Sequence, residues 1–194
     1  SAASTKLLHG GLRYLEHGQF GLVREGLVER AWWIEQAPHL ARPLPILLPI
    51  YEKSRRSLLK IKIGLTIYDG LAGKASLMGR HKKLTPSELL ALLPELKPEG
   101  LVGGYRFFDG QMDDRALGLW AADQAGKAGV SIRENIAVDR VTRSGQVIAG
   151  GNRQSYDLVY NITGPWVEQL LTRSGIESSV RLSLVKGSHL VFDF

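Results

Sequence analysis

Apolar and charged positions separate cleanly near the start of the chain. The apolar ones fall on a single helical stripe: Phe20, Val23, Leu27, Ala31 and Ile34. The charged ones fall on the opposite side: Arg24, Glu25, Glu29 and Arg30. This pattern predicts an amphipathic helix of about 17 residues that starts at Gly18.

The segment at residues 37–51 reads "APHLARPLPILLPIY" and contains four prolines. Each proline removes a backbone donor, so a long helix is excluded and an extended or edge strand is predicted. Residues 53–74 are ambiguous, because Ile61, Ile63 and Leu65 alternate as in a strand whereas Ile61, Leu65 and Tyr68 share a helical face. Periodicity alone does not decide between the two.

Two later segments carry helix-start signals. Thr85, Pro86 and Glu88 form a capping box ahead of a short helix that Pro94 ends. Asp113 and Asp114 lie where a helix N-terminus favours carboxylates, and Gly129 suits the end of that second helix.

From residue 130 the pattern changes to short extended runs: "VSIRENIAVDRV", "QVIAG" and "YDLVYNIT". The last run passes into "GPWVEQLL", a helical start with Pro165 in its first turn. A strand, a glycine and a helix in that order present backbone N–H groups to a phosphate or a flavin edge. The final run, "RLSLVKGSHLVFDF", alternates like a strand.

Composition narrows the chemistry. The 194 residues are 44% hydrophobic, and Lys and Arg exceed Asp and Glu by 25 − 19 = 6, which favours anionic partners. Cysteine is absent, so disulfides, thiolate metal sites and a cysteine nucleophile are excluded, and a reducing compartment fits. No apolar run approaches the roughly 20 residues that span a bilayer.

Histidine and aromatic positions point to no metal or nucleic-acid site. His17, His39 and His81 lack metal-ligand spacing and are interpreted as cap, turn and surface residues. Basic residues are not interleaved with aromatic ones in a regular way, so nucleic-acid binding is not expected.

Several strings together resemble the flavin-dependent glycerol-3-phosphate dehydrogenases. They are residues 4–51, beginning "STKLLHGGLRYLEH", then "DGQMDDRALGLWAA", "NITGPWV" and "VKGSHLVF". The string "KLLHGGLRYLEH" is specific to that family, whereas "NITGPWV" is shared with many D-amino-acid-oxidase-like flavoproteins. Members begin with a strand and a G-x-G-x-x-G turn and continue beyond "KGSH", so the chain resembles a middle segment and an upstream part is expected.

The resemblance implies a mixed α/β (α+β) fold. Part of it would be an FAD-binding Rossmann-like domain, over residues 1–40 and 110–175. The rest would be part of an antiparallel-sheet substrate or cap domain, over residues 41–109 and 176–194.

The resemblance also implies FAD as cofactor. The positions that match the family's flavin-contacting residues are Ser4, Thr5, Lys6, His9, Gly10, Gly11, Thr163 and Gly164. Glycines would let the backbone lie flush against a flat ring. Tyr160 and Ile162 depart from the family, which more often has small residues at these positions, so the local fit of the cofactor differs there.

Arg13 and Tyr14 match residues that face the substrate in the family, with roles in holding an anionic group and orienting it. From the residues alone, Arg13 pairs with a nearby carboxylate such as Glu16, and Tyr14 is a core residue. The histidine of "KGSH", His189, matches a substrate-pocket residue and is assigned as general base, with Lys186 as electrostatic support.

The implied reaction is oxidation of glycerol 3-phosphate to dihydroxyacetone phosphate by hydride transfer to flavin. Electrons would pass to a quinone, or to oxygen as in the related oxidases. A cytoplasmic location follows, peripheral on the inner face of the cytoplasmic membrane, and a homodimer is allowed. The alternative is a non-catalytic fragment, and the segment alone is expected to be colourless and inactive because pyrophosphate contacts are missing.

The family's membrane association favours a helix at residues 53–74. Its basic residues could lie on an anionic surface, each contributing roughly 1 kcal/mol: Lys53, Arg55, Arg56, Lys60 and Lys62. The alternative is a core-packing helix with a solvated basic edge.

Overall fold

The computed structural model describes residues 4–73, 78–185, 187 and 188. It divides into two compact units, Ser1–Ala125 and Gly126–Phe194. The predicted division into cofactor and substrate domains follows other boundaries and stays a prediction.

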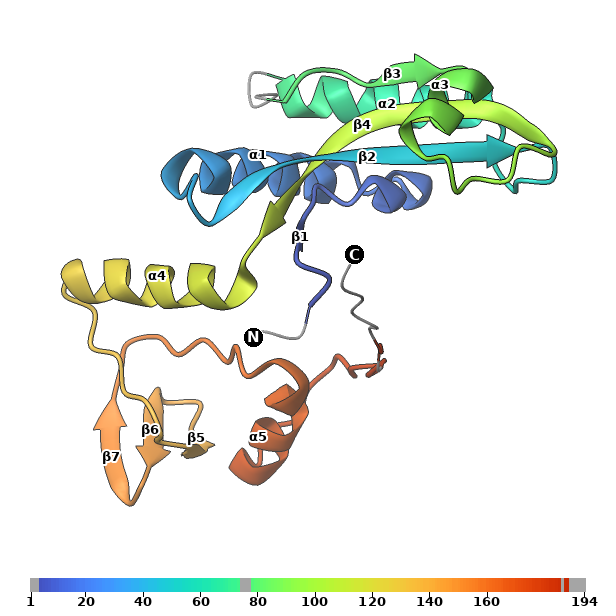
Figure 1. Ribbon diagram of the computed structural model, residues 1–194. Helices are drawn as coiled ribbons and strands as arrows, with labels where there is room; N and C mark the ends of the chain where they lie inside the picture. Colours follow the sequence, from blue (N-terminus) through green and yellow to red (C-terminus); the bar gives the residue numbers. More distant parts are fainter. Residues whose placement is uncertain (1–3, 74–77, 186, 189–194) are drawn as a thin grey trace. The chain divides into compact units, whose positions relative to one another are not determined.

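The first unit is built on an antiparallel sheet centred on β4 (Leu101–Met112). Strand β2 (Ala41–Tyr51) pairs along one side of β4, and β1 (Leu7–Leu8) and β3 (Lys82–Leu84) pair along the other (Figure 1). The proline-rich segment is therefore an edge strand, as predicted, because one of its sides needs no backbone donors.

Two helices cover one face of this sheet, α1 (Phe20–Gln36) and α2 (Leu58–Ala72). Val23 and Leu27 of α1 and Leu65 of α2 are fully buried against Phe107 and Tyr105 of β4. The α1 helix is confirmed, and the ambiguous segment is a helix, whose N-cap Ser57 accepts a hydrogen bond from the backbone N–H of Lys60. Periodicity allowed a strand or a helix here, and burial of the face with Leu65 and Tyr68 in the core favours the helix.

A shorter helix, α3 (Pro86–Leu92), packs against the sheet near the start of β4. There Leu89 joins Leu84 and Leu101 in a second core cluster. The predicted capping box is present: the Thr85 side chain accepts from the Glu88 N–H, and the Glu88 carboxylate accepts from the Thr85 N–H at 2.8 Å. The Thr85 N–H, and then the Thr85 hydroxyl, donate to the Glu88 carboxylate and hold the pKa of Glu88 below its usual value.

Helix α4 (Asp114–Lys127) follows β4. Asp113 Oδ1 accepts from the Ala116 N–H at 2.9 Å, and the N–H of Gly129 donates to the Gly126 carbonyl just past the helix. Both ends thus agree with the sequence prediction.

The second unit contains a three-stranded antiparallel sheet and one helix. The sheet runs β5 (Val138–Val141), β6 (Gln146–Ala149) and β7 (Asn152–Ser155). A short turn of 3₁₀ helix, η3 (Gly164–Trp166), leads into α5 (Val167–Ser174), so the predicted helical start at Pro165 is confirmed.

Several predicted strands are wrong. Residues 130–137, 156–163 and 181–185 are not in strands. No described strand pairs with them, so they lack the ladder that would make them part of a sheet; Leu158, Tyr160 and Ile162 are 66%, 76% and 87% exposed.

The fold class is confirmed as mixed α/β with antiparallel sheets. His81 is not a surface residue, since its side chain is 15% exposed and its Nδ1 lies 2.6 Å from Asp69 Oδ2. Among the described helices none combines the length and apolar character needed to cross a bilayer.

Candidate functional site

The segment from Ser4 to Tyr14 contains most of the predicted site residues, and β4 fixes its backbone. Leu7 and Leu8 pair with Gln111 and Gly110 of β4. The next residue of β4, Met112, donates its N–H to the Lys6 carbonyl at 2.9 Å.

Asp114 anchors the first part of this segment. Its Oδ2 accepts from Ser4 Oγ at 2.7 Å, and its Oδ1 forms an ion pair with Lys6 Nζ. Lys6 has φ of 59°, a left-handed conformation that is uncommon for a residue with a side chain, and its N–H donates to Ser4 Oγ at 3.0 Å. The Lys6 ammonium, and then the Ser4 hydroxyl, hold the pKa of Asp114 below its usual value.

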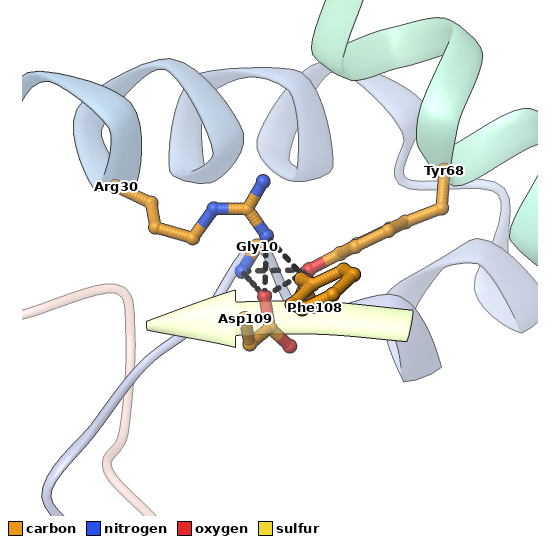
Figure 2. Close-up of polar contacts among 5 residues, drawn as sticks. All are labelled: Gly10, Arg30, Tyr68, Phe108 and Asp109. Carbon is orange, nitrogen blue, oxygen red and sulfur yellow. Dashed lines mark hydrogen bonds and ion pairs between the residues drawn. The ribbon is translucent and has the colours of Figure 1, made fainter. Parts of the chain in front are cut away.

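Gly10 anchors the second part of the segment, in the interior of the first unit (Figure 2). Its N–H donates to Tyr68 Oη at 2.9 Å and to Asp109 Oδ1 at 3.3 Å. A Cβ at this position would lie 2.5 Å from Leu27 Cδ2 and 2.6 Å from Tyr68 Oη. Glycine is therefore required here by packing against α1 and α2.

Asp109 gathers the donors of this cluster on one oxygen. Its Oδ1 accepts from Tyr68 Oη at 2.7 Å and from Arg30 Nη1 at 2.6 Å, and Arg30 Nη1 also donates to the Phe108 carbonyl at 3.0 Å (Figure 2). Arg30 and Asp109 are 3% and 4% exposed. Burial, and then the Asp109 carboxylate, raise the pKa of Tyr68 far above its usual value.

Other side chains of the segment remain exposed on its solvent side: Thr5, His9, Arg13 and Tyr14. Among the described residues, none of these four side chains makes a hydrogen bond or an ion pair. Arg13 and Tyr14 lie on η1 (Leu12–His17), which starts after Gly11. Gly11 has φ of +73°, and the Tyr14 ring lies where a Gly11 Cβ would project, so glycine is needed there as well.

Glu16 does not pair with Arg13, and Tyr14, at 45% exposed, is not a core residue. The Glu16 carboxylate instead accepts two hydrogen bonds from Arg56, at 2.7 and 2.6 Å, and lies 3.4 Å from Lys60 Nζ. Arg56 lowers the pKa of Glu16 to about 2. Both interpretations made from the residues alone are thus wrong, and Arg13 is left facing solvent.

A cavity of about 380 Å³ lies beside Arg13 and this ion pair. Its walls come from η1, β2, α2, Phe20 of α1 and Phe107 of β4. They are mainly apolar, with Leu15, Ile46 and Ile61 among them. Three cationic residues also line it: Arg13, Arg56 and Lys60.

The remaining predicted residues do not belong to this segment of the chain. Thr163 belongs to the second unit, where its Oγ1 donates to Asn161 Oδ1 at 2.8 Å just before Gly164. Lys186 and His189 lie outside the described residues. The structure therefore brings together the first group of predicted residues, from Ser4 to Tyr14.

Sequence reasoning missed the buried cluster behind this segment. The prediction that Arg30 lies on the solvent side of its helix is wrong, and nothing in the sequence pattern marks Tyr68 or Asp109 as part of the site. One signal was available: Arg30 follows Leu27 by three residues and precedes Ile34 by four, so it lies on the apolar stripe. A charged residue there requires a buried partner.

Comparison with known proteins identifies the class. The family model "DAO: FAD dependent oxidoreductase" matches residues 1–193. The chain belongs to this family of FAD-dependent oxidoreductases.

Individual relatives agree with the resemblance. A glycerol-3-phosphate dehydrogenase of Synechocystis sp. is 35% identical over all of this chain and 38% of its own length. An alpha-glycerophosphate oxidase of Streptococcus pyogenes is 34% identical over all of this chain and 34% of its own length. The chain thus spans little more than a third of these relatives.

A solved structure is similar in fold. The glycerol-3-phosphate dehydrogenase of Bacillus halodurans, described as complexed with FAD, aligns with a TM-score of 0.57 at 21% identity. The alignment covers 89% of this chain and 28% of the other. The likeness concerns the fold alone.

Proposed function

We propose that the complete protein containing this chain oxidises sn-glycerol 3-phosphate to dihydroxyacetone phosphate with FAD as cofactor. The observation that carries the proposal is the anchoring of the segment from Ser4 to Tyr14: Asp109 binds the backbone N–H of Gly10, and Asp114 binds the side chains of Ser4 and Lys6. Relatives of matching sequence bear the names glycerol-3-phosphate dehydrogenase and alpha-glycerophosphate oxidase.

The residues present fit FAD. A flavin is a flat ring with polar edges, and a rigid backbone carrying exposed hydroxyl and imidazole groups suits such a ring. Thr5 and His9 are exposed on the anchored segment, and their side chains have no hydrogen-bond partner in the described part of the chain. Ser4, Lys6, Gly10 and Gly11 shape the backbone of the segment next to Thr5 and His9, while Thr163 and Gly164 stay predicted flavin contacts.

FAD, when bound, supplies the acceptor for the hydride that leaves the carbinol carbon of the substrate. Arg13 binds the phosphate through its guanidinium, which matches phosphate geometry in a bidentate manner. Tyr14 orients the secondary hydroxyl. His189 removes the hydroxyl proton as the carbonyl forms, and Lys186 stabilises the negative charge that develops on the oxygen.

Anaerobic titration of the purified complete protein tests this proposal. Glycerol 3-phosphate should bleach the flavin absorbance and yield dihydroxyacetone phosphate, whereas glycerol, which lacks the phosphate, should not. Arg13→Met should raise KM for glycerol 3-phosphate at least about tenfold, the loss expected for a charge-assisted contact. Arg24→Met, at an exposed arginine of α1, is the matched control.

His189→Ala tests the proton transfer separately. We expect kcat to fall by a factor of about 10² to 10⁴, the usual contribution of a general base. Unimpaired turnover would remove His189 from that role. An Arg13→Met enzyme with the KM of the wild type would likewise contradict the proposed phosphate contact.

The proposed electron acceptor is a quinone. Steady-state assays with a soluble quinone analogue and with oxygen as alternatives separate a dehydrogenase from an oxidase. Faster turnover with oxygen than with the quinone would contradict this part of the proposal.

We also propose that the protein lies in the cytoplasm and binds the inner face of the cytoplasmic membrane through α2. Leu59, Ile63 and Ile67 form an exposed apolar stripe along this helix, at 66%, 54% and 37% exposed. Exposed Arg55 and Lys62 lie on or next to the same helix. An apolar stripe with nearby cations is typical of helices that lie on anionic lipid.

Co-sedimentation with vesicles of neutral or anionic phospholipid tests this surface. Arg55→Glu/Lys62→Glu should abolish binding to anionic vesicles, because both side chains are exposed and neither belongs to the ion pair with Glu16. Undiminished binding by this variant would dispose of the membrane surface. Size-exclusion chromatography of the same samples tests whether the protein is a homodimer.

A further inference from the structure

Tyr68 connects the anchored segment to the buried ion pair. Its hydroxyl accepts a hydrogen bond from the Gly10 N–H at 2.9 Å and donates one to Asp109 Oδ1 at 2.7 Å. The hydroxyl therefore bridges the backbone of the segment and the carboxylate (Figure 2). Tyr68 lies on α2 and is separated from Gly10 by 58 positions in the sequence.

The Tyr68 ring is itself held from two directions. Its centroid lies 6.3 Å from that of Phe107, in an edge-to-face arrangement, and the Arg30 guanidinium lies 5.8 Å from it. Tyr68 is 2% exposed. A ring fixed in this way delivers the hydroxyl to one position, where it is the shorter of the two acceptors of the Gly10 N–H, at 2.9 Å against 3.3 Å for Asp109 Oδ1.

The buried ion pair of Arg30 and Asp109 is not explained by stability alone. Two charges buried together often stabilise a protein no more than well-packed apolar side chains of the same volume. The ion pair instead fixes geometry, because Asp109 Oδ1 accepts hydrogen bonds from Tyr68, Arg30 and Gly10 and so orients all three. The cluster thus defines the position of Gly10 relative to α1, α2 and β4.

We propose that Tyr68 is a positioning residue for the cofactor. Its hydroxyl sets the backbone at Gly10, and through it the placement of His9 and Gly11 against FAD. This inference rests on the proposed function, because it takes the segment from Ser4 to Tyr14 as the flavin contact. Tyr68 itself acts from the interior, behind Gly10.

Tyr68→Phe in the complete protein tests the proposal, with Tyr105→Phe as the matched control. Tyr105 is equally buried, and its hydroxyl donates one hydrogen bond, to the Leu58 carbonyl at 3.1 Å, away from the segment. Tyr68→Phe removes both hydrogen bonds of the hydroxyl, of which the one from the Gly10 N–H holds the segment. We expect this variant to weaken FAD binding by about three- to tenfold, the effect of losing that one hydrogen bond, and to shift the flavin absorbance bands. Tyr105→Phe should leave both within error of the wild type.

Hydrogen–deuterium exchange of the apoprotein supplies a readout that does not depend on FAD. Tyr68→Phe should speed exchange in peptides that cover residues 4–14, and Tyr105→Phe should not. A ring-fluorinated tyrosine at position 68, which keeps the ring and weakens the hydroxyl as an acceptor, serves where Tyr68→Phe does not fold.

Two failures are distinguishable. If the wild type binds FAD and Tyr68→Phe binds it with unchanged affinity and spectrum, or if Tyr105→Phe changes both equally, the positioning role is overturned and the proposed function stands. If the wild-type protein takes up no FAD, the proposed function fails and this proposal fails with it.

Discussion

Asp109 Oδ1 lies 2.6 Å from Arg30 Nη1, and both side chains are almost fully buried between β4 and α1. The carboxylate also accepts from Tyr68 and from the backbone of Gly10. Five residues further along the chain, Asp114 holds Ser4 and Lys6. Asp114 thus fixes the chain before the β4-paired residues Leu7 and Leu8, and Asp109 fixes it after them.

Removing Arg30 should be strongly destabilising, because it leaves the Asp109 charge buried without its cation. For Arg30→Met we expect a loss of about 3–5 kcal/mol in the free energy of unfolding, measured by urea titration. The double variant Arg30→Met/Asp109→Leu should lose less than Arg30→Met, since it buries no lone charge. Arg24→Met, at an exposed position of α1, should change stability by less than about 0.5 kcal/mol. A double variant as unstable as the sum of its single variants would contradict coupling of the pair.

Gly10→Ala should be destabilising because its Cβ would lie 2.5 Å from Leu27 Cδ2. Overpacking of this kind costs about 1–3 kcal/mol, which urea unfolding resolves. Gly21→Ala is the control, since Gly21 lies in α1 and a Cβ added there would meet no atom within 4 Å. Alanine there should raise the free energy of unfolding by about 0.5–1 kcal/mol, because it favours the helix over glycine. Equal effects of the two substitutions would show that Gly10 is not in close contact with α1.

The capping box at Thr85 predicts a smaller effect. Thr85→Ala removes the oxygen that accepts a hydrogen bond from the Glu88 N–H. The free energy of unfolding, measured with urea, should therefore fall by about 0.5–2 kcal/mol. Thr85→Ser keeps the oxygen and should stay within a few tenths of a kcal/mol of the wild type. If serine and alanine behave alike, the side-chain oxygen is not what stabilises the start of the helix.

Local signals in the sequence predicted α1, β2, α3 and both ends of α4, because helix caps, prolines and apolar stripes act over a few residues. The strand expected at residues 156–163 failed, since a strand exists only where another strand pairs with it. The cluster around Asp109 could not be found in the same way. Its members come from positions 10, 30, 68 and 109, and pairing of such distant residues is decided by the packing of α1 and α2 on one face of β4.

The ion pair between Glu16 and Arg56 predicts how the stability of the protein depends on pH. Arg56 lowers the pKa of Glu16 from 4.5 to about 2, so its carboxylate is more acidic in the folded protein than in the unfolded chain. A depressed pKa adds stability that is fully present above the unfolded value of 4.5 and is lost as pH falls through the folded value. Glu16→Gln cannot ionise and lacks this contribution at every pH.

The difference in Tm between the wild type and Glu16→Gln should therefore be constant above pH 4.5 and shrink below it, toward about pH 2. Thermal unfolding followed by circular dichroism across this range measures it. Added salt should reduce the difference at neutral pH, because the ion pair lies near the surface. Glu25→Gln is the control, since Glu25 is exposed on α1 and makes no ion pair among the described residues. A Tm difference for Glu16→Gln that does not change between neutral pH and the acid limit of folding would show that Arg56 does not hold Glu16 ionised.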